Sequence, residues 1–181
     1  MPVDPAANAF TLSCEFATTT AVRLFPYDMK RYVALAVRDP DLVYVGGGNT
    51  PAMRAVWHEL GFSTLLRSAD EAGTLMAGIS AGANIWFERY VTDNVPGGAV
   101  RDGMGWLHGC FCPHLDSEPW REPVLAAQPS PVVGAGDGVV LLYQNELCTD
   151  VVCSRSADVA VFRERRRGGE LQSRRARELP A

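Results

Sequence analysis

Apolar positions recur with two different spacings along the chain, and the two spacings alternate. Short apolar runs bounded by turn residues are typical of buried strands, whereas apolar residues three and four positions apart indicate helices. The first pattern predicts strands over 19–24, 42–45, 74–79, 138–143, 151–153 and 157–163. The second pattern predicts helices over 29–37, 51–60, 65–72 and 81–90. Strands that alternate with helices predict a mostly parallel sheet with helices on both faces.

Three loops are candidates for the carboxyl ends of strands, where sheets of this kind carry their functional sites. They are GGGNT at 46–50, the turn at Ser80 in AGISAGAN, and CPHLDSEPWREP at 112–123. Three glycines allow the backbone of the first loop to approach a ligand and to direct its N–H groups at a phosphate or an oxyanion. These loops are therefore the candidate site.

A single serine, Ser80, lies where the apolar run 74–79 ends and the predicted helix begins. Its neighbours are small, with Gly78 before it and Gly82 after it. Such a turn can lift a serine hydroxyl clear of the backbone as a nucleophile. Small residues also allow a helix to pack tightly on a strand, and serine is a common helix N-cap, so this segment alone leaves both interpretations open.

The composition is that of an ordinary globular domain. The 181 residues are 47% apolar and 21% charged, which is typical of one domain with a hydrophobic core. No apolar run reaches the roughly 18 residues of a membrane span, and the first ten residues lack a signal-peptide pattern. We therefore expect a cytoplasmic protein.

The net charge of −4 is unevenly distributed. Residues 163–181 contain seven arginines and three glutamates, which gives +4 there and −8 over the first 162 residues. A basic tail can contact nucleic acid or acidic membranes. Because no aromatic residue follows Phe162 to stack on bases, we expect neither partner. Residues 164–181 are predicted to form a strand pair that turns at two glycines, or a solvated tail.

Five cysteines occur at irregular spacings: Cys14, Cys110, Cys112, Cys148 and Cys153. This pattern is not that of a disulfide framework, so we interpret them as reduced thiols. The segment CFCPH offers three metal ligands, but no second CxxC or HxxxH pair accompanies it. We therefore expect no metal and no other cofactor.

Taken together, VYVGGGNT, AGISAGAN and FCPHLDSEP resemble, in this order, the serine peptidase family that includes dipeptidase E (aspartyl dipeptidase) and, more distantly, cyanophycinase. The resemblance extends from about Cys14 to about Arg163. It implies a flavodoxin-like, doubly wound sheet related to class I glutamine amidotransferase domains, in one domain over 1–181. The implied activity is hydrolysis of short peptides by a serine nucleophile.

Matched position by position, the resemblance implies that Ser80 is the nucleophile and His114 the general base. A neutral imidazole can accept the serine proton and later donate it to the leaving amine. The oxyanion donors would be backbone N–H groups of Gly47 or Gly48 together with that of Ala81.

The acid that orients His114 has three candidates. Asp137 in GAGDGVV matches a glutamate of the family, Asp93 in VTDN matches another acid, and Asp116 lies two residues from the histidine. We choose Asp137 as the third member of the triad. Asp93 and Asp116 are assigned to substrate binding, with loop ordering as the alternative for Asp116.

Arg121 and Asn49 are further candidates for binding the substrate. Members of the family cleave after an N-terminal aspartate, and an arginine after the histidine would hold that carboxylate; Arg121 in EPWREP is the nearest match. Asn49 either contacts substrate or shapes the glycine turn. The expected substrates are short peptides, and one alternative is that only peptides with an N-terminal aspartate are cleaved (Asp-X specificity). The sequence leaves open the exact peptide and the oligomeric state, with a homodimer among the possibilities.

The family pattern opens with a glycine-rich strand followed by a strand and a helix, which have no match before Cys14. We therefore expect an N-terminally truncated sheet, either natural or due to a start codon placed too late, with residues 1–13 poorly ordered.

A rival function is that of a catalytically impaired paralogue that binds a ligand or partner at the glycine loop. Amidotransferase-like activity would require a cysteine nucleophile at the position of Ser80, so the serine argues against it.

Overall fold

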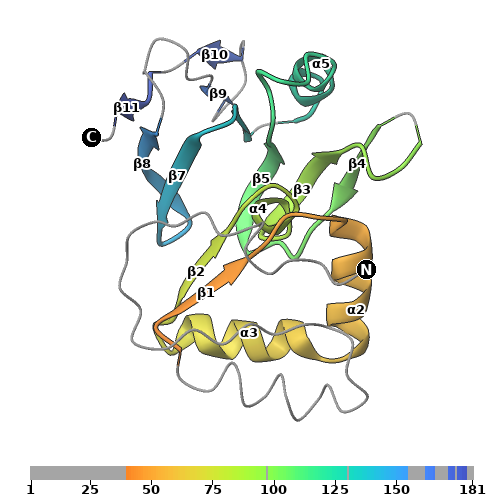
Figure 1. Cartoon of the computed structure of the whole chain (residues 1–181), viewed down its shortest axis with the longest axis vertical. Coiled ribbons are helices and arrows are strands. Elements are labelled where there is room, and N and C mark those ends of the chain that lie inside the picture. The colour runs from red at the N-terminus through yellow and green to blue at the C-terminus, as the bar shows by residue number, and fades with distance from the viewer. Residues whose placement is uncertain are drawn as a thin grey trace, which may run out of the picture.

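The computed structural model describes residues 40–96, 98–129, 131–154, 162–165, 171–173 and 175–178, which form an α/β fold (Figure 1). The helices are α2 (Thr50–Glu59), α3 (Phe62–Glu71), α4 (Ala81–Asn84) and α5 (Arg121–Ala126). The strands are β1 (Leu42–Val45), β2 (Leu75–Gly78), β3 (Phe87–Thr92), β4 (Ala99–Asp102), β5 (Leu107–Cys112), β6 (Val132–Ala135), β7 (Val139–Gln144), β8 (Leu147–Cys153), β9 (Phe162–Arg165), β10 (Gln172–Ser173) and β11 (Arg177–Glu178). The strand predicted at 19–24, the helix predicted at 29–37 and the segment 1–13 lie outside the described residues.

The described strands form three sheets. β1 and β2 pair in parallel, with Val45 opposite Gly78 at their carboxyl ends. The largest sheet has the order β10-β9-β6-β5-β3-β4; β6, β5 and β3 are parallel to one another, and antiparallel strands flank them on both sides. The β7–β8 hairpin and the short β11 form the third sheet. This mixed α/β architecture is consistent with the flavodoxin-like fold expected from the sequence.

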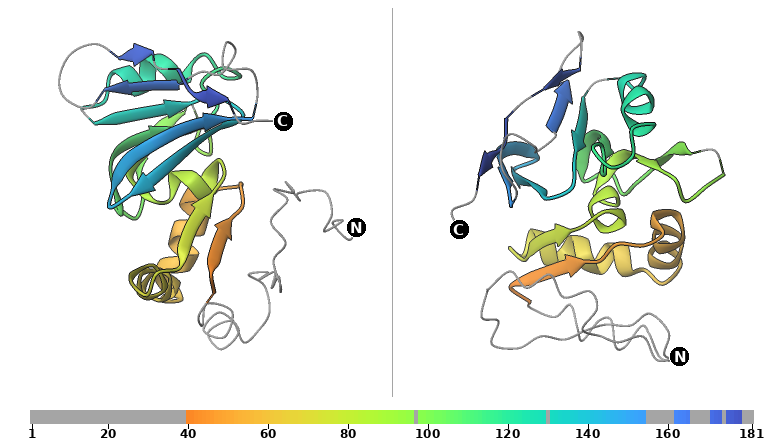
Figure 2. Two further views of the ribbon diagram at one scale, coloured as in Figure 1. Left: turned by 90° about the vertical axis from the view of Figure 1, so that its left-hand side faces the viewer. Right: turned by 45° about the horizontal axis from the view of Figure 1, so that its top comes forward.

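An aromatic core connects the β1–β2 sheet to the larger sheet. Helices α2 and α3 lie against β1 and β2 (Figures 1 and 2). Trp57 of α2 meets Phe62 of α3 edge-on at 5.0 Å and lies 6.1 Å from Trp86, between ring centroids. Phe87 of β3 stacks on Phe111 of β5 at 4.7 Å. These rings belong to one continuous core, which joins the two helices to the strands.

The helix predicted over 81–90 is wrong beyond Asn84. α4 ends at that residue, and the chain continues as β3 between β4 and β5. Ile85 and Trp86 are buried, as their apolar character suggests, but they lie at the connection between the two elements. The apolar residues Phe87, Tyr90 and Val91 of β3 are three and four positions apart, which is also the spacing of apolar residues on one face of a helix.

Some of the other helices and strands were predicted from the sequence, and some were missed. The predicted strands at 42–45, 74–79, 138–143 and 151–153 correspond to β1, β2, β7 and β8, and the helices at 51–60 and 65–72 to α2 and α3. β4, β5, β6 and α5 were not predicted. β9 begins near the end of the predicted strand 157–163 and pairs antiparallel with β10. None of the described helices is long and apolar enough to span a membrane.

Candidate active site

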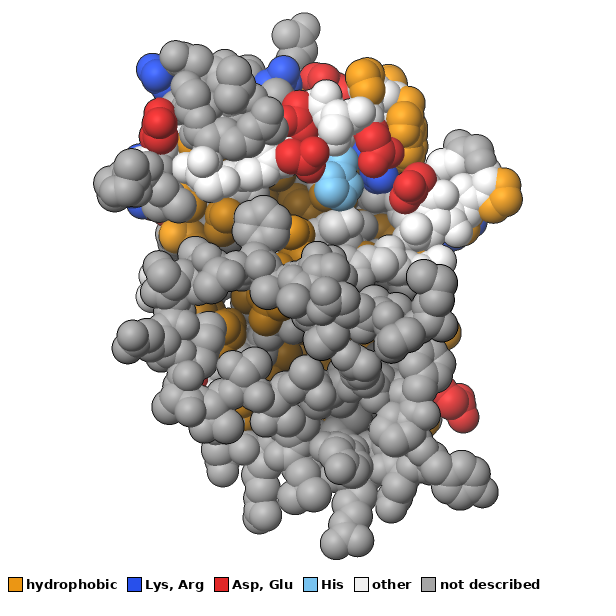
Figure 3. Space-filling view, viewed as in Figure 1, with side chains coloured by type: hydrophobic (Ala, Val, Ile, Leu, Met, Phe, Trp, Pro, Cys, Tyr) orange, Lys and Arg blue, Asp and Glu red, His pale blue; other side chains and the backbone are white. Residues whose placement is uncertain are grey.

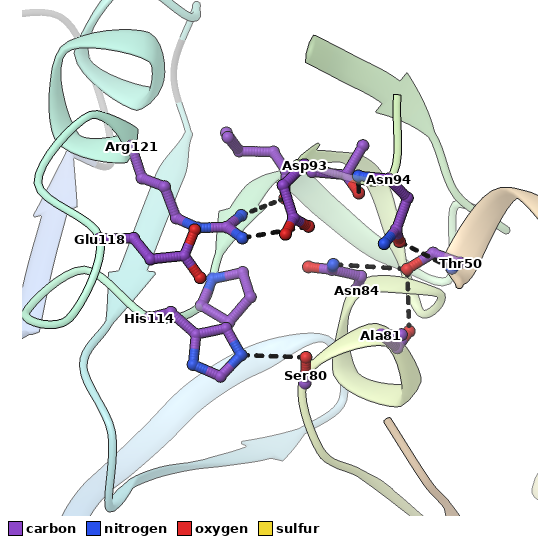
Figure 4. Close-up of polar contacts among 12 residues, drawn as sticks. Thr50, Ser80, Ala81, Asn84, Asp93, Asn94, His114, Glu118 and Arg121 are labelled. Atoms are coloured by element: carbon purple, nitrogen blue, oxygen red, sulfur yellow. Dashed lines mark hydrogen bonds and ion pairs between the residues drawn. The ribbon is translucent and has the colours of Figure 1, made fainter. Parts of the chain in front are cut away.

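The candidate site residues lie on loops that follow five strands, and Figure 4 shows three of them, Ser80, Asp93 and His114, in one region. The glycine loop 46–49 follows β1, Ser80 follows β2 and Asp93 follows β3. His114 follows β5, and Asp137 follows β6. Parallel strands present their carboxyl ends at the same edge of a sheet, so residues far apart in the sequence meet here.

Ser80 occupies a strained turn between β2 and α4. Its φ of 52° and ψ of −115° place it in a region that residues other than glycine rarely adopt. Hydrogen bonds hold the turn on both sides: the N–H of Ile79 donates to the carbonyl oxygen of Val45 (3.1 Å), and the N–H of Asn84 donates to that of Ser80 (2.9 Å). A serine on a sharp strand-to-helix turn presents its hydroxyl in the manner of a nucleophile.

Two glycines allow α4 to begin this close to the strands. A Cβ atom added to Gly78 would lie 2.1 Å from the carbonyl oxygen of Gly82, and one added to Gly82 would lie 2.1 Å from that of Val45. Both contacts are with backbone atoms, which cannot move aside as a flexible side chain can. The small neighbours of Ser80 are therefore required where α4 crosses β1 and β2.

We expect Gly82→Ala to lower the free energy of unfolding by about 3 kcal/mol, because α4 must move away from β1 to accommodate the methyl group. Urea denaturation followed by circular dichroism measures the change. Gly46→Ala is the matched control, since a Cβ atom added at Gly46 meets no atom within 4 Å. Equal losses in the two variants would contradict the close packing at Gly82.

His114 bridges Ser80 and Asp137. Its Nε2 lies 3.0 Å from Oγ of Ser80, and its Nδ1 lies 2.6 Å from Oδ1 of Asp137. The histidine also has a positive φ of 60°, and its side chain is 31% exposed. With the proton on Nδ1 held by the carboxylate, Nε2 is left as the acceptor for the hydroxyl hydrogen of Ser80.

Asp116 orders the loop that carries Asp137. Its Oδ1 accepts a hydrogen bond from the N–H of Asp137 at 2.8 Å. A Cβ atom added to Gly136 would lie 2.8 Å from Cγ of Asp116, so the two loops pack closely. Of the two roles considered for Asp116, loop ordering is the one that these contacts describe.

Asp116→Ala is expected to lower kcat of a reaction carried out by Ser80 and His114 by about 10²-fold with little change in KM, because Asp137 and His114 lose their fixed positions. Asp116→Asn retains a carbonyl oxygen as acceptor and should keep most of the activity. Steady-state kinetics on both variants tests the difference. Wild-type kcat in Asp116→Ala would show that the hydrogen bond to Asp137 does not position the site.

Asp93 lies against Arg121 rather than His114. Its Oδ1 is 3.3 Å from Nη2 of Arg121, and the Nε of Arg121 is 3.0 Å from Oε2 of Glu118. Arg121 is only 2% exposed, whereas the sequence interpretation gave it to a substrate carboxylate. Instead, two carboxylates of the protein occupy its guanidinium. Of the two leading candidate acids, Asp137 is therefore the one in contact with the histidine.

The glycine loop passes beside Ser80. A Cβ atom added to Gly47 would lie 3.5 Å from Cβ of Ser80 and 4.0 Å from its Oγ. Gly48 has a φ of 144°, which favours glycine. Within the part of the chain that the structure describes, the N–H groups of Gly47, Gly48 and Ala81 donate no hydrogen bond. These three groups can therefore serve an oxyanion at Ser80.

A buried polar network behind the glycine loop was missed in the sequence. The hydroxyl of Thr50 donates to the carbonyl oxygen of Ala81 (3.4 Å) and accepts from Nδ2 of Asn84 (3.4 Å). The N–H of Thr50 donates to Oδ1 of Asn94 at 3.3 Å. The side-chain oxygen of Asn49 accepts a hydrogen bond from the N–H of Ala52 and so caps α2. Of the two roles expected for Asn49, this contact corresponds to shaping the glycine turn. An asparagine within the short helix after Ser80 was the available signal, since buried amides need partners.

Cys110 and Cys112 lie in the core of β5 and add no reactive group. Burial raises the pKa of the Cys110 thiol to about 11 and that of the Cys112 thiol to about 12, so both are uncharged at neutral pH. No group of three His, Cys, Asp or Glu side chains in the described ranges is placed to hold a metal ion. The CFCPH segment therefore contributes His114 to this cluster.

An α/β fold that gathers a serine, a histidine and an aspartate at the ends of its strands is the arrangement on which serine hydrolases are built. Comparison with known families is more specific, because the model of peptidase family S51 matches residues 6–151. The chain belongs to peptidase family S51. The family predicted from the three sequence motifs is thereby confirmed.

A curated relative comes from Bacillus subtilis (strain 168), where it is named "Uncharacterized peptidase YgaJ". It is 41% identical over 125 residues, which cover 66% of this chain. The same alignment covers 54% of the relative. The chain thus spans about half the length of the relative that it matches.

Proposed function

We propose that the chain is a serine peptidase that hydrolyses short peptides, with Ser80 as nucleophile, His114 as general base and Asp137 as the orienting acid. The observation that carries this proposal is the pair of contacts made by His114, 3.0 Å to Ser80 and 2.6 Å to Asp137. Membership of a peptidase family supports it independently.

The reaction would proceed through two acyl-transfer steps. Oγ of Ser80 attacks the peptide carbonyl carbon while Nε2 of His114 takes the hydroxyl proton. The resulting oxyanion accepts hydrogen bonds from the N–H groups of Ala81 and of Gly47 or Gly48. His114 then donates its proton to the leaving amine, and a water molecule hydrolyses the ester in the same way. Asp137 holds the imidazolium that forms in each step.

Specificity for an N-terminal aspartate would need a cation for the substrate side chain. Arg121 was the candidate, but it is buried and paired with Asp93 and Glu118. These contacts do not support Asp-X specificity, so the proposal is limited to short peptides. The rival hypothesis is a catalytically impaired paralogue that only binds a ligand. It predicts the same contacts among Ser80, His114 and Asp137 but no hydrolysis of peptides.

We further propose that the described sheets are parts of one flavodoxin-like, doubly wound domain related to class I glutamine amidotransferase domains. The parallel strands β3, β5 and β6, together with loops that meet at their carboxyl ends, support this architecture. A cytoplasmic location, a homodimer, and the absence of nucleic-acid and membrane partners are predictions from the sequence, and fractionation with light scattering and binding assays would test them.

A panel of unmodified dipeptides and tripeptides, analysed by chromatography of the released amino acids, tests the proposed activity. We expect cleavage of at least some members by the purified chain. Each hydrolysis should be lost in Ser80→Ala and retained in Glu59→Gln, an exposed position at the end of α2 opposite to Asn49 and the glycine loop. If no peptide is cleaved although ligands bind near the glycine loop, the binding-protein alternative is favoured.

A further inference from the structure

Arg121 gathers two carboxylates on one side of the candidate site. Its side chain is 3% exposed, whereas that of Asp93 is 59% exposed and that of Glu118 is 32% exposed. It also contacts the carbonyl oxygen of Val91 at 3.2 Å and the ring of Trp120, 4.7 Å away. The cation is therefore enclosed, and the carboxylates form the surface that a ligand would meet.

The charge of this group is negative. One guanidinium against two carboxylates leaves −1, and an exposed carboxylate face attracts cations and repels anions. Figure 3 shows acidic side chains gathered around an exposed histidine at the upper end of the molecule. A substrate carboxylate would meet repulsion here, whereas a substrate cation would not.

Both carboxylates are connected to the loops of the candidate site. The N–H of Glu118 donates to the carbonyl oxygen of His114 at 2.9 Å, so the two residues share one turn. Asp93 precedes Asn94, whose side-chain oxygen accepts from the N–H of Thr50 at the end of the glycine loop. In Figure 4, Glu118 lies beside His114, and Asp93 lies between these two residues and Thr50.

Asn84 supplies a second, independent observation. It is 4% exposed, and its Oδ1 accepts no hydrogen bond from the residues that the structure describes. The hydroxyl of Thr50 uses its single hydrogen to donate to the carbonyl oxygen of Ala81. Toward Asn84 this hydroxyl can therefore act only as an acceptor, so the Nδ2 of Asn84 faces Thr50 and the amide oxygen faces away from it. In Figure 4 this oxygen points toward the side of the site where Asp93 and Arg121 lie.

We propose that Asp93, Glu118 and Asn84 form a subsite for a primary ammonium group of the peptide substrate. An ammonium has three N–H donors and no acceptor, which matches two carboxylates and one amide oxygen. The group can be the α-amino group of a free N-terminus or the side chain of a lysine. This inference rests on the proposed function, because it defines the substrate class of the same site, and it disfavours acidic N-terminal residues.

Binding to Ser80→Ala tests the subsite without turnover. Calorimetry would compare alanyl-alanine with lactyl-alanine, in which a hydroxyl replaces the ammonium group at nearly the same size. We expect alanyl-alanine to bind about tenfold more tightly, as one charge-assisted contact allows. N-acetyl-lysyl-alanine separates the two sources of the ammonium: tight binding assigns a side-chain amine, and weak binding assigns the α-amino group. Aspartyl-alanine should bind more weakly than alanyl-alanine.

Asp93→Asn, added to Ser80→Ala, should abolish the preference for the ammonium ligands. It is the cleaner variant because Asp93 is exposed and Glu118 still compensates Arg121. Glu59→Gln in the same background is the control and should retain the preference; thermal unfolding establishes that both variants are folded. Equal binding of alanyl-alanine and lactyl-alanine, tightest binding of aspartyl-alanine, no binding of either amine, or an unchanged preference in Asp93→Asn would each overturn the subsite.

Hydrolysis by the wild-type chain, measured in parallel, separates this inference from the proposed function. Cleavage of peptides without discrimination between ammonium and hydroxyl ligands means that the peptidase stands and the subsite fails. Discrimination in binding without any cleavage means that the subsite stands and the peptidase fails.

Discussion

Ser80→Ala is expected to lower kcat for peptide hydrolysis by about 10⁶-fold, the order found when the nucleophile of a serine peptidase is removed. The change deletes only the hydroxyl, so the turn and the free energy of unfolding should be nearly unchanged. The strained backbone at this residue, with φ of 52°, is also easier to retain with a small side chain than with a large one.

The partner histidine provides the internal check on that result. His114→Ala should cost nearly as much as Ser80→Ala, and the double variant should be hardly worse than either single variant, because the two residues act as one unit. Steady-state kinetics with a peptide from the panel measures all three. Multiplicative losses in the double variant would show that His114 does not act through Ser80.

Asp137→Asn is expected to lower kcat by about 10⁴-fold with the fold intact. The amide cannot hold Nδ1–H of His114 as a carboxylate does, so the imidazole can take the tautomer that leaves Ser80 without a base. The 2.6 Å contact between Asp137 and the histidine is the structural reason for so large an effect.

Asp93→Asn is the matched comparison for that variant. Asp93 contacts Arg121 and not His114, so its loss should act mainly on KM while kcat is largely kept. The reverse pattern, with kcat lost in Asp93→Asn and kept in Asp137→Asn, would make Asp93 the orienting acid.

Local features of the site could be predicted from the sequence because they depend on neighbouring residues. Gly78 and Gly82 around Ser80 indicated a tight strand-to-helix turn, and the structure explains them by backbone contacts at 2.1 Å. His114 likewise lay in a loop chosen from the sequence as part of the site, although the strand before it, β5, was not predicted. What the sequence could not determine was whether Asp93 or Asp137 would meet that histidine, since each follows a different strand.

The errors have a physical cause as well. Residues beyond Asn84 were predicted as helix because Phe87, Tyr90 and Val91 of β3 have the three- and four-residue spacing of a helix rather than strict alternation. Arg121 was expected to be available to a ligand because arginines are usually exposed. Its guanidinium pairs with Glu118, three residues before it, and with Asp93 from a different segment, and no local pattern could have predicted the second contact.

The most direct test of the central claim is the identity of the acylated residue. The wild-type chain would be mixed with p-nitrophenyl acetate, quenched in acid within the first turnover, and digested for mass spectrometry. Attack by Oγ of Ser80 on the ester carbonyl releases p-nitrophenol and leaves one acetyl group on the serine. We predict an acetyl group on the peptide that contains Ser80, and its absence from that peptide in both Ser80→Ala and His114→Ala. Acetylation at another residue alone, or release of p-nitrophenol at the wild-type rate by Ser80→Ala, would contradict the assignment of Ser80 as the nucleophile.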